Sequence, residues 1–164
     1  MLFSENLPTK TASFCIFEKT NLVVKTISFS FDDHDLFGLA YTIRHKVFVE
    51  EEGVDPALEH DDHEAESTHY LLYYNNLPVG TARWRRTVNG IKLERFAVLP
   101  GYRNKGLGDA LVKKVLEDVV PFRETVYLHS QLRACSLYQR HGFVISGEIF
   151  IEAGMGHYNM VLKG

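Results

Sequence analysis

Apolar and polar side chains alternate with different periods along the chain, and each period predicts an element. Residues 21–31 are rich in β-branched and aromatic side chains, which indicates a first strand. A helical period follows, and Asp32 or Asp33 can cap this helix. Its predicted apolar face consists of Leu36, Leu39, Ala40, Ile43 and Val47.

Turn residues divide the middle of the chain into three further strands. Residues 70–74 and 79–86 flank the turn Asn75-Asn76-Leu77-Pro78. Asn89-Gly90, a dipeptide typical of two-residue hairpins, leads into a strand over residues 91–99.

A second helix is predicted after Pro100-Gly101, where the preceding strand stops. A short strand over 126–129 and a helix over about 133–140 come next, and Gly142 is expected to end that helix in a left-handed conformation. The apolar face of the second helix consists of Leu107, Ala110, Leu111, Val115 and Val119.

Two last strands, 143–151 and 158–162, are expected on either side of a loop at 154–156. The order of strands and helices predicts an α/β fold, with a mixed sheet that carries helices on its faces. Residues 1–20 show no clear period. They are interpreted as an N-terminal extension of a single domain over residues 21–164.

Composition narrows the class of protein. A length of 164 residues, with 45% apolar and 24% charged side chains, is ordinary for one globular domain. A net charge of −3 argues against nucleic acid as the main partner. Cys15 and Cys135 are too far apart in sequence to indicate a disulfide framework or a thiolate zinc site. No signal peptide or membrane-spanning run is visible, so we expect a cytoplasmic protein without a membrane partner.

The segment from Arg103 to Gly108 stands between a predicted strand and a predicted helix. Such a turn directs backbone N–H groups toward one point at the positive end of the helix dipole, where a phosphate can bind. Gly106 and Gly108 permit backbone angles that a Cβ opposes, and Arg103 can bind two phosphate oxygens. The segment matches neither a P-loop nor the dinucleotide fingerprint. A plain strand-to-helix connection is the alternative.

Arg103-Asn104-Lys105-Gly106-Leu107-Gly108 resembles the acyl-CoA signature Arg/Gln-x-x-Gly-x-Gly/Ala of the GNAT N-acetyltransferase superfamily. The resemblance covers roughly residues 23–162 and points to a small bacterial subgroup, whose members often carry Gln at the place of Glu52. Other matching segments are 47–54, His69, 80–83, 131–134, 137–143 and 157–160. The resemblance implies the GNAT fold, with six to seven mostly antiparallel strands. It also implies acetyl-CoA as co-substrate and no metal.

The resemblance assigns roles to individual residues. The strand segment Phe96-Ala97-Val98 offers its backbone to pantetheine, and the Val98 N–H stabilises the oxyanion. The phosphate turn is Arg103 to Gly108, and Asp109, which opens the helix, is a further cofactor-binding residue. Gln131 and Tyr138 line the thiol end, and Ala134 also binds the cofactor. Tyr138 stands where the family places the acid that protonates the CoA thiolate. Its alternative role is that of a packed tyrosine.

Two residues are candidates for the general base, because the attacking amine is mostly protonated at neutral pH. Glu94 lies on the strand beside the expected acetyl site, and His157 lies on the last pair of strands. Alternatively, Glu94 pairs with Arg95 or Arg83, and His157 is merely hydrogen-bonded.

The acidic segment Glu59-His60-Asp61-Asp62-His63-Glu64 invites a metal interpretation. It lacks a helix-spaced histidine pair and cysteine, so a solvated acidic loop is favoured. In the family this region borders the acceptor site, and its negative charge is therefore expected to favour a cationic amine.

The sequence thus predicts an enzyme that transfers acetyl directly from acetyl-CoA to a small-molecule or peptide amine in a ternary complex. The alternatives are a non-catalytic acyl-CoA-binding regulator and an interaction module that pairs through exposed edge strands. The family also makes a homodimer possible.

Overall fold

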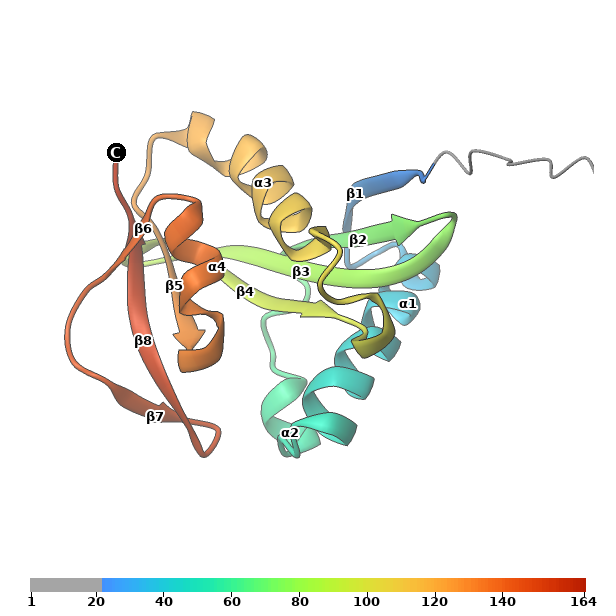
Figure 1. The fold of residues 1–164 in the computed structure, drawn as a ribbon, viewed down its shortest axis with the longest axis horizontal. Helices are drawn as coiled ribbons and strands as arrows, with labels where there is room; N and C mark the ends of the chain where they lie inside the picture. The colour runs from blue at the N-terminus through green and yellow to red at the C-terminus, as the bar shows by residue number, and fades with distance from the viewer. Residues whose placement is uncertain (1–21) are drawn as a thin grey trace, which may run out of the picture.

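Eight strands form one mixed sheet in the computed structural model, which describes residues 22–164 (Figure 1). The order across the sheet is β1-β2-β3-β4-β5-β8-β6, and β7 pairs with β8. Only β4 and β5 run parallel among these pairs. The predicted extension, residues 1–20, lies outside the described residues. The strands are β1 (Val24–Ser30), β2 (Thr68–Tyr74), β3 (Leu77–Thr87), β4 (Gly90–Val98), β5 (Val126–Gln131), β6 (Phe143–Ile145), β7 (Phe150–Glu152) and β8 (Met155–Leu162).

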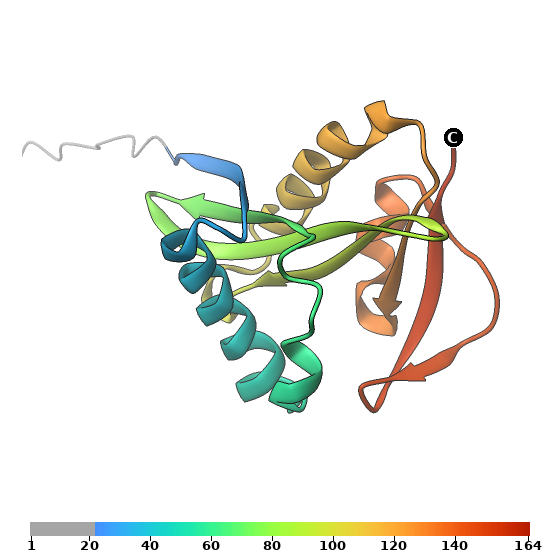
Figure 2. The same cartoon turned by 180° about the vertical axis from the view of Figure 1, so that it is seen from behind.

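Helices cover both faces of the sheet, as the two opposite views show (Figures 1 and 2). One face carries α1 (His34–Arg44), which continues into a π-helix (His45–Glu51), and the short α2 (Pro56–Glu59). The other face carries α3 (Leu107–Val119) and α4 (Cys135–Arg140). Short 3₁₀ turns lie at Pro100–Tyr102, Val120–Phe122 and Leu132–Ala134.

The alternation of side chains along β2 produces two separate cores. Tyr70 and Leu72 belong to the core under α3, whereas Leu71 between them packs in the core under α1. The α3 face is the one that the helical period predicts, because Leu107, Leu111, Val115 and Val119 are all buried. The cap of α1 also agrees with prediction, since Asp33 accepts a hydrogen bond from the Leu36 N–H. The sheet therefore separates two apolar layers.

Strands β4 and β5 diverge after a short parallel contact, and the divergence positions the site. They pair only from Ile91 to Leu93 on the β4 side. In Figure 1, β5 and β8 turn steeply away from β4 beyond this contact. On its other side β4 contains a bulge opposite Ala82, where Arg95 has a left-handed backbone with φ +60°. The half of β4 that follows Leu93 therefore has one edge without a neighbouring strand among the described residues.

Two predicted boundaries in the last part of the chain and one predicted core residue were wrong. The predicted strand 143–151 is two strands, because Gly147 interrupts it with φ +92°; together with the separate β7, this gives eight strands instead of six to seven. The connection between β7 and β8 is Ala153-Gly154, and Met155 and Gly156 already belong to β8. Leu39 is 40% exposed, because α1 turns Ala40, Ile43 and the guanidinium of Arg44 inward instead.

The hairpin between β3 and β4 turns one residue earlier than predicted, at Val88-Asn89. Gly90 is the first residue of β4 and has φ +121°. A Cβ on Gly90 would lie 2.2 Å from the Thr125 carbonyl oxygen, so the close approach of that backbone requires glycine here.

Candidate active site

The turn that precedes α3 has the backbone geometry of an anion-binding site. Asn104 and Gly106 have φ +60° and +73°, and Gly106 caps α3 without a side-chain hydrogen bond. The first bond of the helix runs from the Ala110 N–H to the Gly106 carbonyl, so the preceding amides of α3 have no partner within the helix. These amides form a concave set of donors. The left-handed conformation expected for both glycines is found only at Gly106, because Gly108 lies inside α3.

Val98 directs its backbone toward the open edge of β4. The Leu99 N–H donates to the Val79 carbonyl at 2.9 Å, and bonded and non-bonded pairs alternate in an antiparallel ladder. Val98, paired with Gly80, therefore turns its N–H and C=O away from β3. Its carbonyl accepts a hydrogen bond from Arg103 Nε at 2.9 Å. The strand edge expected to contact pantetheine is thus joined to the phosphate turn.

Arg103 also binds a carboxylate in this structure. Its two terminal nitrogens donate to the oxygens of Glu51 at 2.6 and 2.7 Å. This fork-shaped contact is the geometry with which arginine binds a phosphate. The pairing lowers the pKa of the Glu51 carboxyl. Both terminal nitrogens of Arg103 are thus occupied by a residue of the π-helix in this structure.

Tyr138 and Phe96 meet across the divergence of the sheet. The two rings are in edge contact, with centroids 5.7 Å apart, and Phe143 contacts Tyr138 from another side. Tyr138 is buried, and burial raises the pKa of its hydroxyl. No group among residues 22–164 forms a hydrogen bond with that hydroxyl at ordinary distance. Packing thus fixes the ring and leaves the hydroxyl for another partner. Ala134, one turn before Tyr138, packs on the same core.

Glu94 lies in a cluster of positive side chains. Its carboxylate contacts Arg83 at 2.8 Å, Lys92 at 3.1 Å and Arg85 at 3.2 Å. Burial alone would raise the pKa of Glu94, but these cations lower it to about 2. A carboxylate with so low a pKa is a weak base. The geometry therefore favours the ion-paired role that the sequence left open, with Arg83 rather than Arg95 as its partner.

The acidic segment 59–64 is not a solvated loop. Glu59 and Glu64 are buried and form ion pairs with Arg44, whose side chain is 1% exposed. Asp61 contacts Arg83 at 2.6 Å and Arg95 at 3.1 Å. The carboxylates are thus neutralised by arginines of α1, β3 and β4. This pairing removes the physical basis for the expectation that this segment attracts a cationic acceptor.

His157 lies on β8, directly opposite Gln131 on β5. Its ring is 6% exposed and stacks on Phe150, and Nδ1 donates to the Met155 carbonyl at 2.9 Å. Because the carbonyl can only accept, the proton of the neutral ring resides on Nδ1. Nε2 then keeps its lone pair, 4.0 Å from the Glu152 carboxylate.

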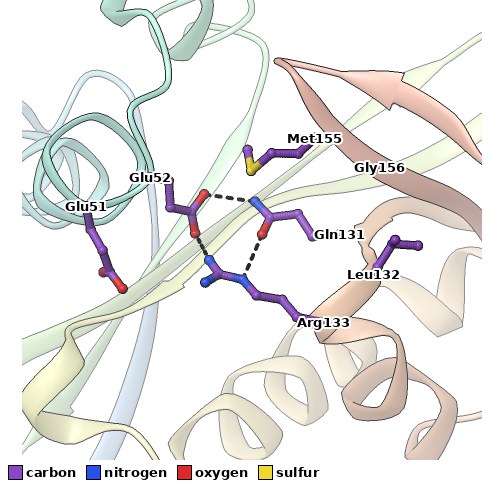
Figure 3. A pocket seen from close by; sticks show the side chains of 7 residues that line it. All are labelled: Glu51, Glu52, Gln131, Leu132, Arg133, Met155 and Gly156. Carbon is purple, nitrogen blue, oxygen red and sulfur yellow. Dashed lines mark hydrogen bonds and ion pairs between the residues drawn. The ribbon is translucent and has the colours of Figure 1, made fainter.

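A pocket of about 380 Å³ lies beside the end of β5 (Figure 3). Glu52 points into it from the end of the π-helix and accepts hydrogen bonds from Gln131, at 2.9 Å, and from Arg133. Arg133 in turn donates to the Gln131 oxygen at 2.9 Å. The remaining lining residues are Glu51, Leu132, Met155 and Gly156. The sequence singled out Gln131 and the unusual Glu52. Leu132 and Arg133 lie in the matching segment 131–134 but received no role, and Met155 gave no signal.

The described residues contain no group of three or more His, Cys, Asp or Glu side chains arranged to hold a metal ion. Among these residues, every helix is too short or too polar to cross a bilayer.

Comparison with known proteins agrees with this geometry. The family model for the acetyltransferase (GNAT) domain matches residues 35–163. The uncharacterized N-acetyltransferase YjcF of Bacillus subtilis is 35% identical over 124 residues, which are 74% of this chain and 89% of YjcF.

Two solved structures share the fold. Escherichia coli ElaA superposes with a TM-score of 0.78 at 23% identity, over 86% of this chain and 100% of ElaA. A GNAT family acetyltransferase from Elizabethkingia anophelis, solved with acetyl-CoA bound, gives a TM-score of 0.62 at 19% identity, over 84% of this chain and 94% of that one. With the family model covering most of the described residues, the chain belongs to the GNAT acetyltransferase family.

Proposed function

We propose that this protein transfers the acetyl group of acetyl-CoA directly to an amine while both are bound. One observation carries the proposal: the open edge of β4 at Val98 leads directly into the turn at the start of α3, whose first amides have no partner within the helix. An acyl-CoA has a matching layout, since its pantetheine can pair with a strand edge and its pyrophosphate can bind helix amides. The bound acetyl-CoA of the Elizabethkingia protein supports the same donor.

The chain supplies groups for each step of this reaction. The amine nitrogen attacks the thioester carbonyl, and the Val98 N–H stabilises the negative charge that develops on its oxygen. The C–S bond then breaks, and the Tyr138 hydroxyl protonates the CoA thiolate. The proton that the nitrogen loses passes to a base, directly or through water, and a proton from the solvent restores the Tyr138 hydroxyl after CoA leaves. The packed ring of Tyr138 and the open edge of Val98 support these two assignments.

His157 is the better supported base of the two predicted candidates, since Glu94 is held ionised by its cations. We expect His157→Ala to lose the acidic limb of the pH profile of kcat/KM, because the group that must be deprotonated is gone. Glu94→Gln should retain that limb. Steady-state kinetics with one amine acceptor across the pH range would decide; an unchanged limb in His157→Ala would exclude this histidine.

Acetyl-CoA should stabilise the protein, and Arg103→Ala should weaken this effect. At about 100 times its dissociation constant a ligand raises the free energy of unfolding by about 2.7 kcal/mol. Without the Arg103 guanidinium, a higher concentration of acetyl-CoA should be needed to reach the same increase in the free energy of unfolding. Thermal unfolding with and without acetyl-CoA measures both quantities.

Lys113→Ala on α3 is a suitable control, because it also removes a cation but lies outside the turn. Absence of any stabilisation in the wild-type protein would contradict the proposed donor. Stabilisation without turnover of any amine would instead favour a non-catalytic acyl-CoA-binding regulator.

A further inference from the structure

The carboxylate of Glu52 is withdrawn from water although it lines a pocket. Its side chain is 5% exposed, and it has two partners, Gln131 and Arg133. A buried carboxylate is costly unless it is hydrogen-bonded and paired with a cation. The site therefore requires a positive group at this position.

The cation that now fills this requirement is on a mostly exposed side chain. The Arg133 side chain is 60% exposed, against 5% for its partner Glu52, and its Nε also donates to the Gln131 oxygen. Its charge is well solvated when released, whereas the Glu52 carboxylate is not. Gln131 Nε2 donates to Glu52 at 2.9 Å and is a second partner of the carboxylate. A ligand cation can therefore replace the guanidinium while the carboxylate stays where it is.

The opposite side of the pocket is apolar. Leu132 and Met155 contribute aliphatic side chains, and Gly156 contributes bare backbone. A Cβ on Gly156 would lie 3.1 Å from Leu132 Cδ1, so the glycine lets the Leu132 side chain pack closely against β8. Methylene groups fit such a wall, and one carboxylate at its end selects a positive terminus.

Given the acetyl transfer proposed above, we infer that this pocket takes an aliphatic diamine as acceptor. One amine reacts, and the second ammonium group replaces Arg133 on Glu52, with the connecting methylenes against Leu132 and Met155. The pair Glu52–Arg133 is then a specificity device: the carboxylate binds the distant charge, and the arginine keeps it satisfied between turnovers. His157, opposite Gln131 on the neighbouring strand, lies near the reacting amine in this arrangement.

The test compares two acceptors of equal length, 1,4-diaminobutane and pentylamine, which differ only in the terminal ammonium or methyl group. We expect the wild-type protein to favour the diamine in kcat/KM, and Glu52→Gln to reduce this preference at least about tenfold, equivalent to about 1.4 kcal/mol. Arg133→Gln should lower KM for the diamine, because the competing guanidinium is removed. Glu117→Gln on the exposed face of α3 is the matched control, with the same change of charge and an unchanged preference.

Equal kcat/KM values for the two acceptors in the wild-type protein would overturn the inference. So would a Glu52→Gln variant that prefers the diamine as strongly as the wild type does. Binding of 1,4-diaminobutane to the CoA complex, measured by calorimetry, gives a second readout that needs no turnover. Acetylation of pentylamine without preference for the diamine would refute only the diamine pocket. Failure of acetyl-CoA to bind would refute the proposed function itself.

Discussion

Tyr138→Phe should lower kcat about 10²–10⁴-fold, because the thiolate would lose its positioned acid. The affinity for acetyl-CoA should change little, since the ring and its contacts with Phe96 and Phe143 are retained. The hydroxyl carries its proton at neutral pH, as a tyrosine ordinarily does, and burial raises its pKa further, which makes it a weaker acid in the absence of a ligand. Single-turnover kinetics, together with thermal shifts by acetyl-CoA, would measure the two effects separately.

Tyr127→Phe is a matched control for this change. Tyr127 lies near the start of β5, and its hydroxyl bonds Thr87 at 2.8 Å, far along the strand from Gln131. Loss of this bond should cost little stability and no turnover. Equal turnover in Tyr138→Phe and the wild type would remove Tyr138 from the mechanism and leave it as a packed aromatic residue.

Arg83→Met should destabilise the fold by about 3–5 kcal/mol, because it leaves buried carboxylates without their cation. The Arg83 side chain is 1% exposed and contacts Asp61 at 2.6 Å, Glu94 at 2.8 Å and Glu64 at 3.1 Å. A loss of this size is a large part of the 5–15 kcal/mol typical of a domain. Urea unfolding at neutral pH measures it.

Arg86→Met on the same strand should cost less, about 1–2 kcal/mol, since this arginine is 53% exposed and its contacts are one ion pair with Glu124 and the faces of Trp84 and Phe122. Arg83→Met should also make the free energy of unfolding depend less on pH in the acidic range. The pKa of Glu94 is lowered to about 2 in the fold, below about 4.3 for an unfolded chain. Its stabilising contribution is therefore present above about pH 4.3 and disappears as pH falls toward 2. Two outcomes would contradict this role of Arg83. One is a similar loss of unfolding free energy in both variants, and the other is a decrease in stability between about pH 4.3 and 2 that is as large in Arg83→Met as in the wild type.

The parts of the site that the sequence located are those encoded in short segments. Arg103 to Gly108 combines a strand stop, a left-handed glycine and an amphipathic helix, so its geometry follows from neighbouring residues. The same holds for α4, where Gly142 ends the helix that carries Tyr138. Local chemistry is sufficient to predict such elements.

The ion-pair network could not be derived from the acidic segment alone. Glu59 and Glu64 resemble solvated residues until their partners, Arg44 and Arg83, are placed in the fold. One signal was available: Arg44 follows Ala40 by four residues, so it lies on the apolar face of its helix. A charge on such a face requires a buried partner. The contact between Glu52 and Gln131 could not be predicted from local sequence, because the two residues are 79 positions apart.

The divergence of β4 from β5 also exposes a strand edge in the middle of the sheet, and such an edge can recruit foreign strands and start aggregation. The chain carries the protections usual for outer strands at this inner position. The bulge at Arg95 interrupts regular pairing, and the Arg103 side chain occupies the Val98 carbonyl. The bulge and the Arg103 side chain therefore make this edge a poor template for a second polypeptide, while the Val98 N–H keeps no strand partner among residues 22–164.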